Sequence, residues 1–441
     1  MRFLILIGLI ACGPNNRNNP GNAEPDATVP DTGNCVGLLC QVVNCEAQGK
    51  PPTTISGTVF APNGTLALYG VTVYIPNLDP GPFVEGAQCE RCDNTPLPGE
   101  PIVQTISDEA GNFTLANTPA GGSVPLVVTI GKWRRIVSIP MVQQCADNPL
   151  PSSLTRLPQH KAEGDIPKIA IATGNCDALE CLLRKLGVSD FEFTPESGDG
   201  RIHMYASNGA NKLADSTPFT NVSALWNDVE KLKQYDIAML SCECGARPAE
   251  KPQVAMDAMK AYADLGGRVF LSHYHNVWIT GEAANPAHAP AVWPTIATCT
   301  ADGFANGDDQ IDQVDNPKGA SFASWMVNVM GSTTPGVIPI QSGSSRQTCT
   351  SIDATKAERW VYMPSGTGQL PQNFQFTTPN ELPEEERCGK VVFSDMHVAS
   401  GSTSRSTNGF PSGCSGAGMT PQEKALAFMF FDIAGCVGDI F

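Results

Sequence analysis

The early part of the sequence carries short hydrophobic runs separated by turn residues. Between residues 55 and 140 the runs are rich in β-branched residues, and turn signals such as Pro62-Asn63-Gly64 lie between them. This pattern predicts short antiparallel strands. The runs are ISGTVF, VTVYI, IVQTI, NFTL, PLVVTI and RRIVSI. Because such strands need to bury one face, residues 51–140 are predicted to form an all-β sandwich.

The hydrophobic pattern changes after residue 165. Buried strands are predicted at 168–173, 235–241, 268–272 and 390–395. Helices are predicted at 178–187, at 253–265 and directly after Thr420, which begins a capping-box sequence. Strands that alternate with helices indicate a mostly parallel sheet covered on both faces. We therefore expect residues 165–441 to form a doubly wound α/β domain of the flavodoxin type.

Two stretches interrupt this organisation. Residues 141–164 are Pro-rich and polar, and we expect them to be a linker. Residues 276–388 lack regular strand–helix alternation and are expected to be a long Gly- and Pro-rich insertion with a few helices. The missing alternation also argues against an eight-fold βα barrel.

The chain begins with MRFLILIGLIAC, in which one Arg precedes a short apolar run that ends at Cys12. The run is too short to cross a bilayer as a helix and predicts an export signal over residues 1–11. Residues 13–34 hold almost no apolar side chains, so we expect them to be disordered. Residues 12–50 are thus expected to be a tether that also carries a cluster of cysteines.

The segment Leu9-Ile10-Ala11-Cys12 resembles the lipobox of bacterial lipoproteins. In that family the signal is cut before the cysteine, which is then acylated. The resemblance implies a lipid anchor on Cys12 and the membrane as a partner. Because Gly13 rather than Asp follows the cysteine, it also implies the outer membrane of the cell envelope, on its periplasmic or surface face.

Charge excludes one class of partner. The net charge of -16 argues against nucleic acid, which needs clustered Lys and Arg to neutralise phosphates. The one basic run, Lys132-Trp133-Arg134-Arg135, is expected to be part of a strand with solvated charges.

The sixteen cysteines indicate disulfides in an oxidising compartment. Cys89 and Cys92 form a C-x₂-C pair, but no second pair completes a zinc site. We expect six cysteines to staple the first domain, namely Cys35, Cys40, Cys45, Cys89, Cys92 and Cys145. Nine more follow residue 170, and because nine is odd, at least one of these thiols is free or pairs between chains.

The stretches ISGTVFAPNG, GVTVYI and TISDEAGNFTLANTPAGG resemble the carboxypeptidase regulatory-like, transthyretin-type domain. In that family a D-x-x-G-x-F-x-L run is a hairpin, matched here by Asp108, Gly111, Phe113 and Leu115. Such domains share a carbohydrate-binding-like sandwich and are mostly accessory modules. The resemblance implies a glycan as one possible partner.

Polar residues follow all four predicted strands of the α/β domain. They are Thr173-Gly174-Asn175, Ser241-Cys242-Glu243-Cys244, Ser272-His273-Tyr274-His275 and Ser394-Asp395-Met396-His397. In a parallel sheet these four ends fall on one edge, which is where open α/β sheets bind ligands. Three interpretations of this edge remain open.

The first interpretation is a thiol site. The domain resembles the class I glutamine amidotransferase-like superfamily, including its trehalose-utilisation-type branch, which has a Cys nucleophile after one strand and a His base after a later one. The resemblance implies Cys242 as nucleophile and His397 or His273 as base, with Asp395 or Glu243 to orient it. The family's Gly-x-Cys-x-Gly elbow is absent, and an oxidising compartment disfavours a free thiolate.

The second interpretation is a metal site. His273 and His275 are two residues apart at a strand end, so both can point to one face. With His397 and Asp395 they would complete a zinc-like ligand set. The third interpretation is a polar strand edge that binds a ligand or nothing, since fold does not imply function.

The whole chain resembles a family of bacterial lipoproteins that contain a GGRVF-SH-H segment, here Gly266 to His275. Some members carry the label tryptophan synthase alpha chain, which export and mixed architecture do not support. We expect a binding or structural role at the cell envelope, with a glycan or an envelope protein as partner. The alternative is a hydrolase or metal-dependent enzyme at the carboxyl edge of the sheet. The sequence does not identify a cofactor.

Overall fold

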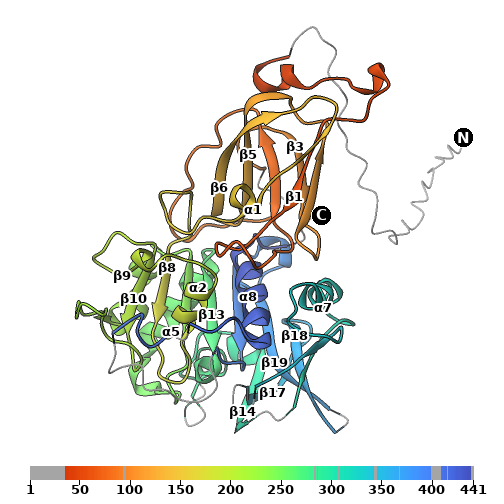
Figure 1. Ribbon diagram of the computed structural model, residues 1–441. Helices are drawn as coiled ribbons and strands as arrows, with labels where there is room; N and C mark the ends of the chain where they lie inside the picture. Colours follow the sequence, from red (N-terminus) through yellow and green to blue (C-terminus); the bar gives the residue numbers. More distant parts are fainter. Residues whose placement is uncertain are drawn as a thin grey trace, which may run out of the picture.

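The computed structural model describes residues 35–92, 96–282, 285, 287–304, 307–341, 345–366, 368–398, 409–414 and 416–438. The expected signal peptide, Cys12 and residues 13–34 lie outside this part of the chain. Figure 1 shows a small part at the top, built mainly of strands, and a larger part below it that holds most of the helices. The protein is thus multidomain and rich in β-sheet.

The small part contains two sheets. One has the antiparallel order β3-β2-β5-β6, and the other has the order β4-β1-β7. Their strands are β1 (Thr54–Thr58), β2 (Thr72–Pro76), β3 (Pro101–Ile106), β4 (Asn112–Ala116), β5 (Gly121–Ile130), β6 (Trp133–Val142) and β7 (Asp147–Pro149). Ile55, Val73, Phe113 and Leu126 are buried in one core cluster, as the alternating pattern requires.

Two local expectations differ from the structure. The Asp108–Leu115 run is not a hairpin within one sheet, because β3 pairs with β2 whereas β4 pairs with β1. The turn between them is held by the Asp108 carboxylate, which accepts the backbone N–H of Asn112 at 2.7 Å. Residues 141–164, expected as a linker, contain β7 and the short helix α1 (Ser152–Thr155), and β7 pairs in parallel with β1.

The larger part is built on one long sheet. Its parallel strands have the order β11-β10-β8-β12-β13-β20, and β9 pairs with β10. These strands are β8 (Ile169–Ala172), β9 (Phe193–Pro195), β10 (Ile202–Ala206), β11 (Thr220–Asn221), β12 (Ile237–Leu240), β13 (Arg268–Ser272) and β20 (Gly389–Ser394). Numbered along the chain, β8, β10, β12, β13 and β20 lie in the order 2-1-3-4-5, which is the strand order of flavodoxin-like sheets.

The expected insertion holds more strands than helices. After β20 the same sheet continues in antiparallel fashion through β19, β18, β15 and β16, while β14 and β17 form a separate pair. The elements are β14 (Ala297–Phe304), β15 (Asp309–Ile311), α7 (Gly319–Asn328), β16 (Val337–Ile338), β17 (Arg346–Ile352), β18 (Glu358–Ser365) and β19 (Gly368–Thr378). The insertion therefore extends the sheet, and its first helix, α6 (Val277–Thr280), also covers part of one face.

Helices cover both faces of the parallel strands. The face with Ile169 and Ile171 packs against α2 and α8, and the face with Ala170 and Ala172 packs against α3 to α6. The helices are α2 (Leu179–Lys185), α3 (Ser223–Trp226), α4 (Val229–Leu232), α5 (Gln253–Asp264), α6 (Val277–Thr280) and α8 (Pro421–Ala434). The strands are buried on both sides, which explains their continuous apolar runs.

Helix α8 also contacts the sandwich. Its expected capping box is present, because Thr420 Oγ1 accepts the N–H of Glu423 and the Glu423 carboxylate accepts the N–H of Thr420. The Trp133 ring at the start of β6 packs edge-on against Phe430 and Phe431, with ring centroids 6.2 and 6.1 Å apart. The two parts thus share one continuous apolar core.

Within the described residues, seven disulfides link fourteen cysteines, and this indicates an extracytoplasmic protein. The expectation that six cysteines staple the first domain is wrong for two of them, because Cys89 and Cys92 pair across to the larger part. The pairs are Cys35–Cys40, Cys45–Cys145, Cys89–Cys388, Cys92–Cys436, Cys176–Cys244, Cys181–Cys414 and Cys299–Cys349. Among the described cysteines, Cys242 has a free thiol.

The expectation of solvated charges in the basic run is also wrong for Lys132 and Arg134. Lys132 is 7% exposed, and its ammonium lies 2.6 Å from the Asp236 carboxylate of the larger part. Arg134 is 3% exposed and pairs with Asp165 at 2.8 Å. These charges are buried because the two parts meet there.

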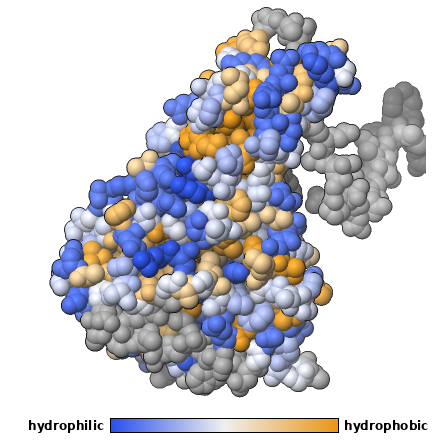
Figure 2. Space-filling model, viewed as in Figure 1, coloured by the Kyte–Doolittle hydropathy of each residue, from blue (hydrophilic) through white to orange (hydrophobic). Residues whose placement is uncertain are grey.

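The face seen in Figure 2 mixes hydrophilic and hydrophobic residues, and a continuous hydrophobic area lies over the sandwich. Within the described ranges, every helix is too short or too polar to cross a bilayer.

Candidate functional site

Three side chains from the predicted strand ends meet at the carboxyl edge of the parallel sheet. Cys242 follows β12, His273 follows β13 and His397 follows β20, and these strands are neighbours in the sheet. The thiol sulfur of Cys242 lies 3.2 Å from His273 Nδ1, and the two imidazole centroids are 5.2 Å apart. One potential ligand atom from each residue lies within 4.8 Å of the other two.

The three side chains are almost inaccessible to solvent. Cys242 is 0% exposed, and His273 and His397 are each 2% exposed. The Nε2 atoms of both histidines are buried without a hydrogen-bond partner among the described residues. A buried ring nitrogen with no partner costs free energy unless a ligand satisfies it.

The backbone around Cys242 is clamped by its neighbours. The carbonyl of Cys242 accepts the N–H of Cys176 at 3.1 Å, and Cys176 forms a disulfide with Cys244. Gly174 approaches so closely that a Cβ there would lie 2.2 Å from the Cys242 carbonyl oxygen. This approach requires glycine and fixes the loop after β8 against the loop after β12.

The position of His273 depends on an unusual backbone conformation. His273 has a φ of +46° and begins a 3₁₀ turn, His273–Asn276, immediately after β13. A left-handed conformation is uncommon for a residue that has a Cβ. The abrupt turn separates the side chain of His273 from that of His275.

Asp177 ties the two histidine-bearing strand ends together. One carboxylate oxygen accepts the Ser272 hydroxyl at 2.6 Å, and the other accepts the backbone N–H of Val398 at 2.8 Å. Ser272 directly precedes His273, and Val398 directly follows His397. Sequence reasoning assigned Asp177 to a helix start, although its place after the polar end of β8 was a signal for the site.

The structure does not bring His275 into this group. Its ring lies between the carbonyl of Ser241, 2.9 Å from Nε2, and the indole N–H of Trp278, 3.0 Å from Nδ1. Both ring nitrogens are thus already used. The expected pairing of His273 with His275 as two ligands fails because β13 ends at Ser272 and both histidines lie in the 3₁₀ turn after it, where residues two apart do not share a face.

Asp395 and Glu243 also face other partners. Asp395 accepts the N–H of Thr348 at 2.8 Å and its hydroxyl at 2.7 Å, so it binds β17. Glu243 accepts the ammonium of Lys251 at 2.5 Å, and both residues are buried. No hydrogen bond among the described residues joins either carboxylate to His273 or His397, so neither Asp395 nor Glu243 orients a histidine base there.

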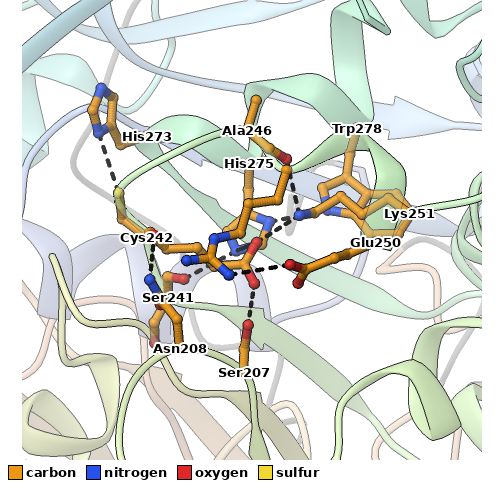
Figure 3. A network of polar contacts seen from close by, with 12 residues as sticks. Ser207, Asn208, Ser241, Cys242, Ala246, Glu250, Lys251, His273, His275 and Trp278 are labelled. Carbon is orange, nitrogen blue, oxygen red and sulfur yellow. Dashed lines mark hydrogen bonds and ion pairs between the residues drawn. The ribbon is translucent and has the colours of Figure 1, made fainter. Parts of the chain in front are cut away.

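Glu243, Lys251 and the residues that bond to them form a second polar network, which Figure 3 shows beside the site. The Cys242–His273 contact lies at one end, and Lys251 and Trp278 lie toward the other. The network holds the loop after β12, because Glu243 also accepts the Ser207 hydroxyl and Lys251 donates to the carbonyl of Ala246 at 3.0 Å. We assign it a positioning role, since its polar groups satisfy one another.

Electrostatics disfavour a thiolate–imidazolium pair. Burial raises the pKa of the Cys242 thiol to about 12. Burial, together with the neighbouring His397, lowers the pKa of His273 to about 2. Burial lowers the pKa of His397, although the Asp177 carboxylate opposes this shift, and burial raises the pKa of Asp395 to about 7. Without a cation, the thiol and both imidazoles are neutral near pH 7.

Comparison with known proteins gives no family. No protein-family model matches the chain, and no curated protein matches it. Among solved structures, a ThuA-like protein from Bacteroides uniformis is 12% identical, with a TM-score of 0.30, and the match covers 59% of this chain and 88% of that chain.

Two interface mutants of a type II cohesin–X-dockerin complex from Acetivibrio cellulolyticus are also similar. They are 18% and 17% identical, with TM-scores of 0.16 and 0.15. The matches cover 34% and 33% of this chain and 79% and 78% of those chains.

Proposed function

We propose that this extracytoplasmic protein binds a transition-metal ion between Cys242, His273 and His397. The observation that carries the proposal is the meeting of one thiol and two imidazoles, with ligand atoms within 4.8 Å, in a buried site. Thiolate and imidazole are the ligands that zinc and copper prefer in proteins. His273 faces the Cys242 sulfur with Nδ1, at 3.2 Å, so a metal ion between these two residues would be bound by that nitrogen.

Several observations favour metal binding over nucleophilic catalysis. A nucleophile has to reach its substrate, and the Cys242 side chain is 0% exposed. A base needs an orienting group, and Asp395 and Glu243 bind Thr348 and Lys251 instead. The position of the second glycine of a nucleophile elbow is held by Cys244, which is committed to a disulfide.

The proposal is tested with Co²⁺, whose visible spectrum reports thiolate and imidazole ligands. After treatment with a chelator, the protein should bind one equivalent of Co²⁺ and become coloured. Cys242→Ser and His397→Ala should lose the colour, whereas His160→Ala, at a partly exposed histidine outside the site, should keep it. Circular dichroism would confirm that each variant folds. Absence of bound cobalt in the folded wild-type protein would refute the proposal.

We further propose that the chain is a lipoprotein held by Cys12, with a regulatory-like sandwich and an amidotransferase-like α/β domain. The lipobox supports the anchor, and the 2-1-3-4-5 strand order supports the assignment of the larger part. A block of lipoprotein processing with a globomycin-type inhibitor should leave a larger precursor. If the protein migrated at the same size with and without the inhibitor, the lipid anchor would be refuted. A glycan or envelope-protein partner stays a prediction.

A further inference from the structure

The disulfide beside the site determines how many thiolates it offers. Cys176, Cys242 and Cys244 lie on two loops in direct contact, and three thiolates there would favour a sulfur-rich zinc site. The disulfide between Cys176 and Cys244 removes two of them. In the oxidised protein the ligand set is therefore one thiolate and two imidazoles.

The site contains three protein ligands rather than four. In the described part of the chain, no other His, Cys, Asp or Glu joins Cys242, His273 and His397 within the same 4.8 Å. Structural zinc sites are almost always closed by four protein ligands, and catalytic zinc keeps an open position for water. Side chains that are 0–2% exposed leave little access for such a water.

From this ligand set we propose that the site selects copper, bound by Cys242 Sγ and one nitrogen each of His273 and His397. The inference rests on the proposed metal-binding function and adds the identity of the metal. One Cys and two His is the ligand set of blue-copper sites, and Cu²⁺ binds nitrogen and sulfur ligands more tightly than Zn²⁺ does.

Charge and burial act on a copper–thiolate complex in different directions, and burial is the one that protects it. A divalent ion and one thiolate leave one positive charge in a buried place, and such a charge needs a counter-charge. The Asp177 carboxylate, which bonds Ser272 and Val398 beside the two histidines, places a negative charge there, whereas the Arg346 guanidinium acts on all three ligands with a positive one. Cu²⁺ oxidises thiols by coupling them in pairs, but Cys242 is buried and is the free thiol among the described cysteines. The Cu²⁺–thiolate bond is thereby protected.

The test is a titration of the chelator-treated, disulfide-intact protein with Cu²⁺ alone. One equivalent should produce an intense visible band from thiolate-to-copper charge transfer. Cys242→Ser and His397→Ala should each abolish the band, and His160→Ala should leave it unchanged. About a tenfold excess of Zn²⁺ should leave most of the band in place.

The possible failures are distinguishable. If one equivalent of Co²⁺ or Zn²⁺ binds in a Cys242-dependent manner and Cu²⁺ gives no band, the copper inference is overturned while the metal site stands. A copper signal that persists in folded Cys242→Ser also overturns it, because the copper then binds elsewhere. If no metal binds to the folded wild-type protein, the metal site itself is refuted.

Discussion

At the scale of single residues, Asp177 is the side chain on which the site geometry depends most. We predict that Asp177→Asn weakens metal binding about 10- to 100-fold. The asparagine can still accept the hydrogen bond from the Val398 N–H, but it loses the acceptor for the Ser272 hydroxyl and it loses the negative charge. The loss of a charged hydrogen bond should also lower the free energy of unfolding by about 1.5–3 kcal/mol. Calorimetric titration and chemical denaturation measure the two effects.

Asp190→Asn is the matched control for that prediction. Asp190 is a half-exposed carboxylate paired with Arg184 at 2.7 Å, away from the site. This variant should change stability by no more than about 0.5 kcal/mol and leave metal affinity unaltered. Equal metal affinity in the two variants would show that Asp177 does not position the histidines.

The same residues show what sequence reasoning reached at this scale. The residue types after each strand were visible, and three of the four strand ends contribute a side chain to the group of Cys242, His273 and His397. The sequence could not tell which of His273 and His275 belongs to the site, because this depends on the left-handed backbone conformation of His273. The partners of Asp177 could not be predicted, because its carboxylate bonds groups 95 and 221 residues away, which no local pattern records.

At the scale of elements, α8 illustrates when local sequence determines structure. Its start follows from a capping box and a proline whose partners lie within three residues of Thr420. The start of α2 differs, since its N-cap is Ala178 without a side-chain cap and Asp177 is used by the site. Tertiary contacts override a local preference when they satisfy the same polar group better.

The cap of α8 leads to a stability prediction. Thr420→Ala should lower the free energy of unfolding by about 1 kcal/mol, because the first-turn N–H of Glu423 loses its acceptor in a partly buried place. Thermal denaturation of the oxidised protein measures the shift. Ser152→Ala, on the exposed start of α1, should change it by less than about 0.5 kcal/mol. Equal shifts for both variants would contradict a capping role.

At the scale of the whole molecule, the sandwich and the α/β part are joined by covalent and apolar contacts. The Cys89–Cys388 and Cys92–Cys436 bonds close sequence separations of 299 and 344 residues. Their connectivity could not be predicted, since cysteine spacing alone does not determine pairing. The buried pair of Lys132 and Asp236 was not predicted either, because the two residues lie in different parts of the chain and no local pattern connects them.

These cross-links predict the behaviour of a chain that is cut once. A protease site inserted beside the exposed Ala162 lies between the two parts in the sequence. After cleavage, the fragments should migrate together without reductant, because two disulfides join them, and should separate once a reductant is added. The variant Cys89→Ser with Cys92→Ser should separate in denaturing gels without reductant, whereas Cys299→Ser with Cys349→Ser removes a bond inside the larger part and should not. If the cut wild-type chain separated without reductant, the two parts would not be covalently linked, and the shared core around α8 would have to hold them together alone.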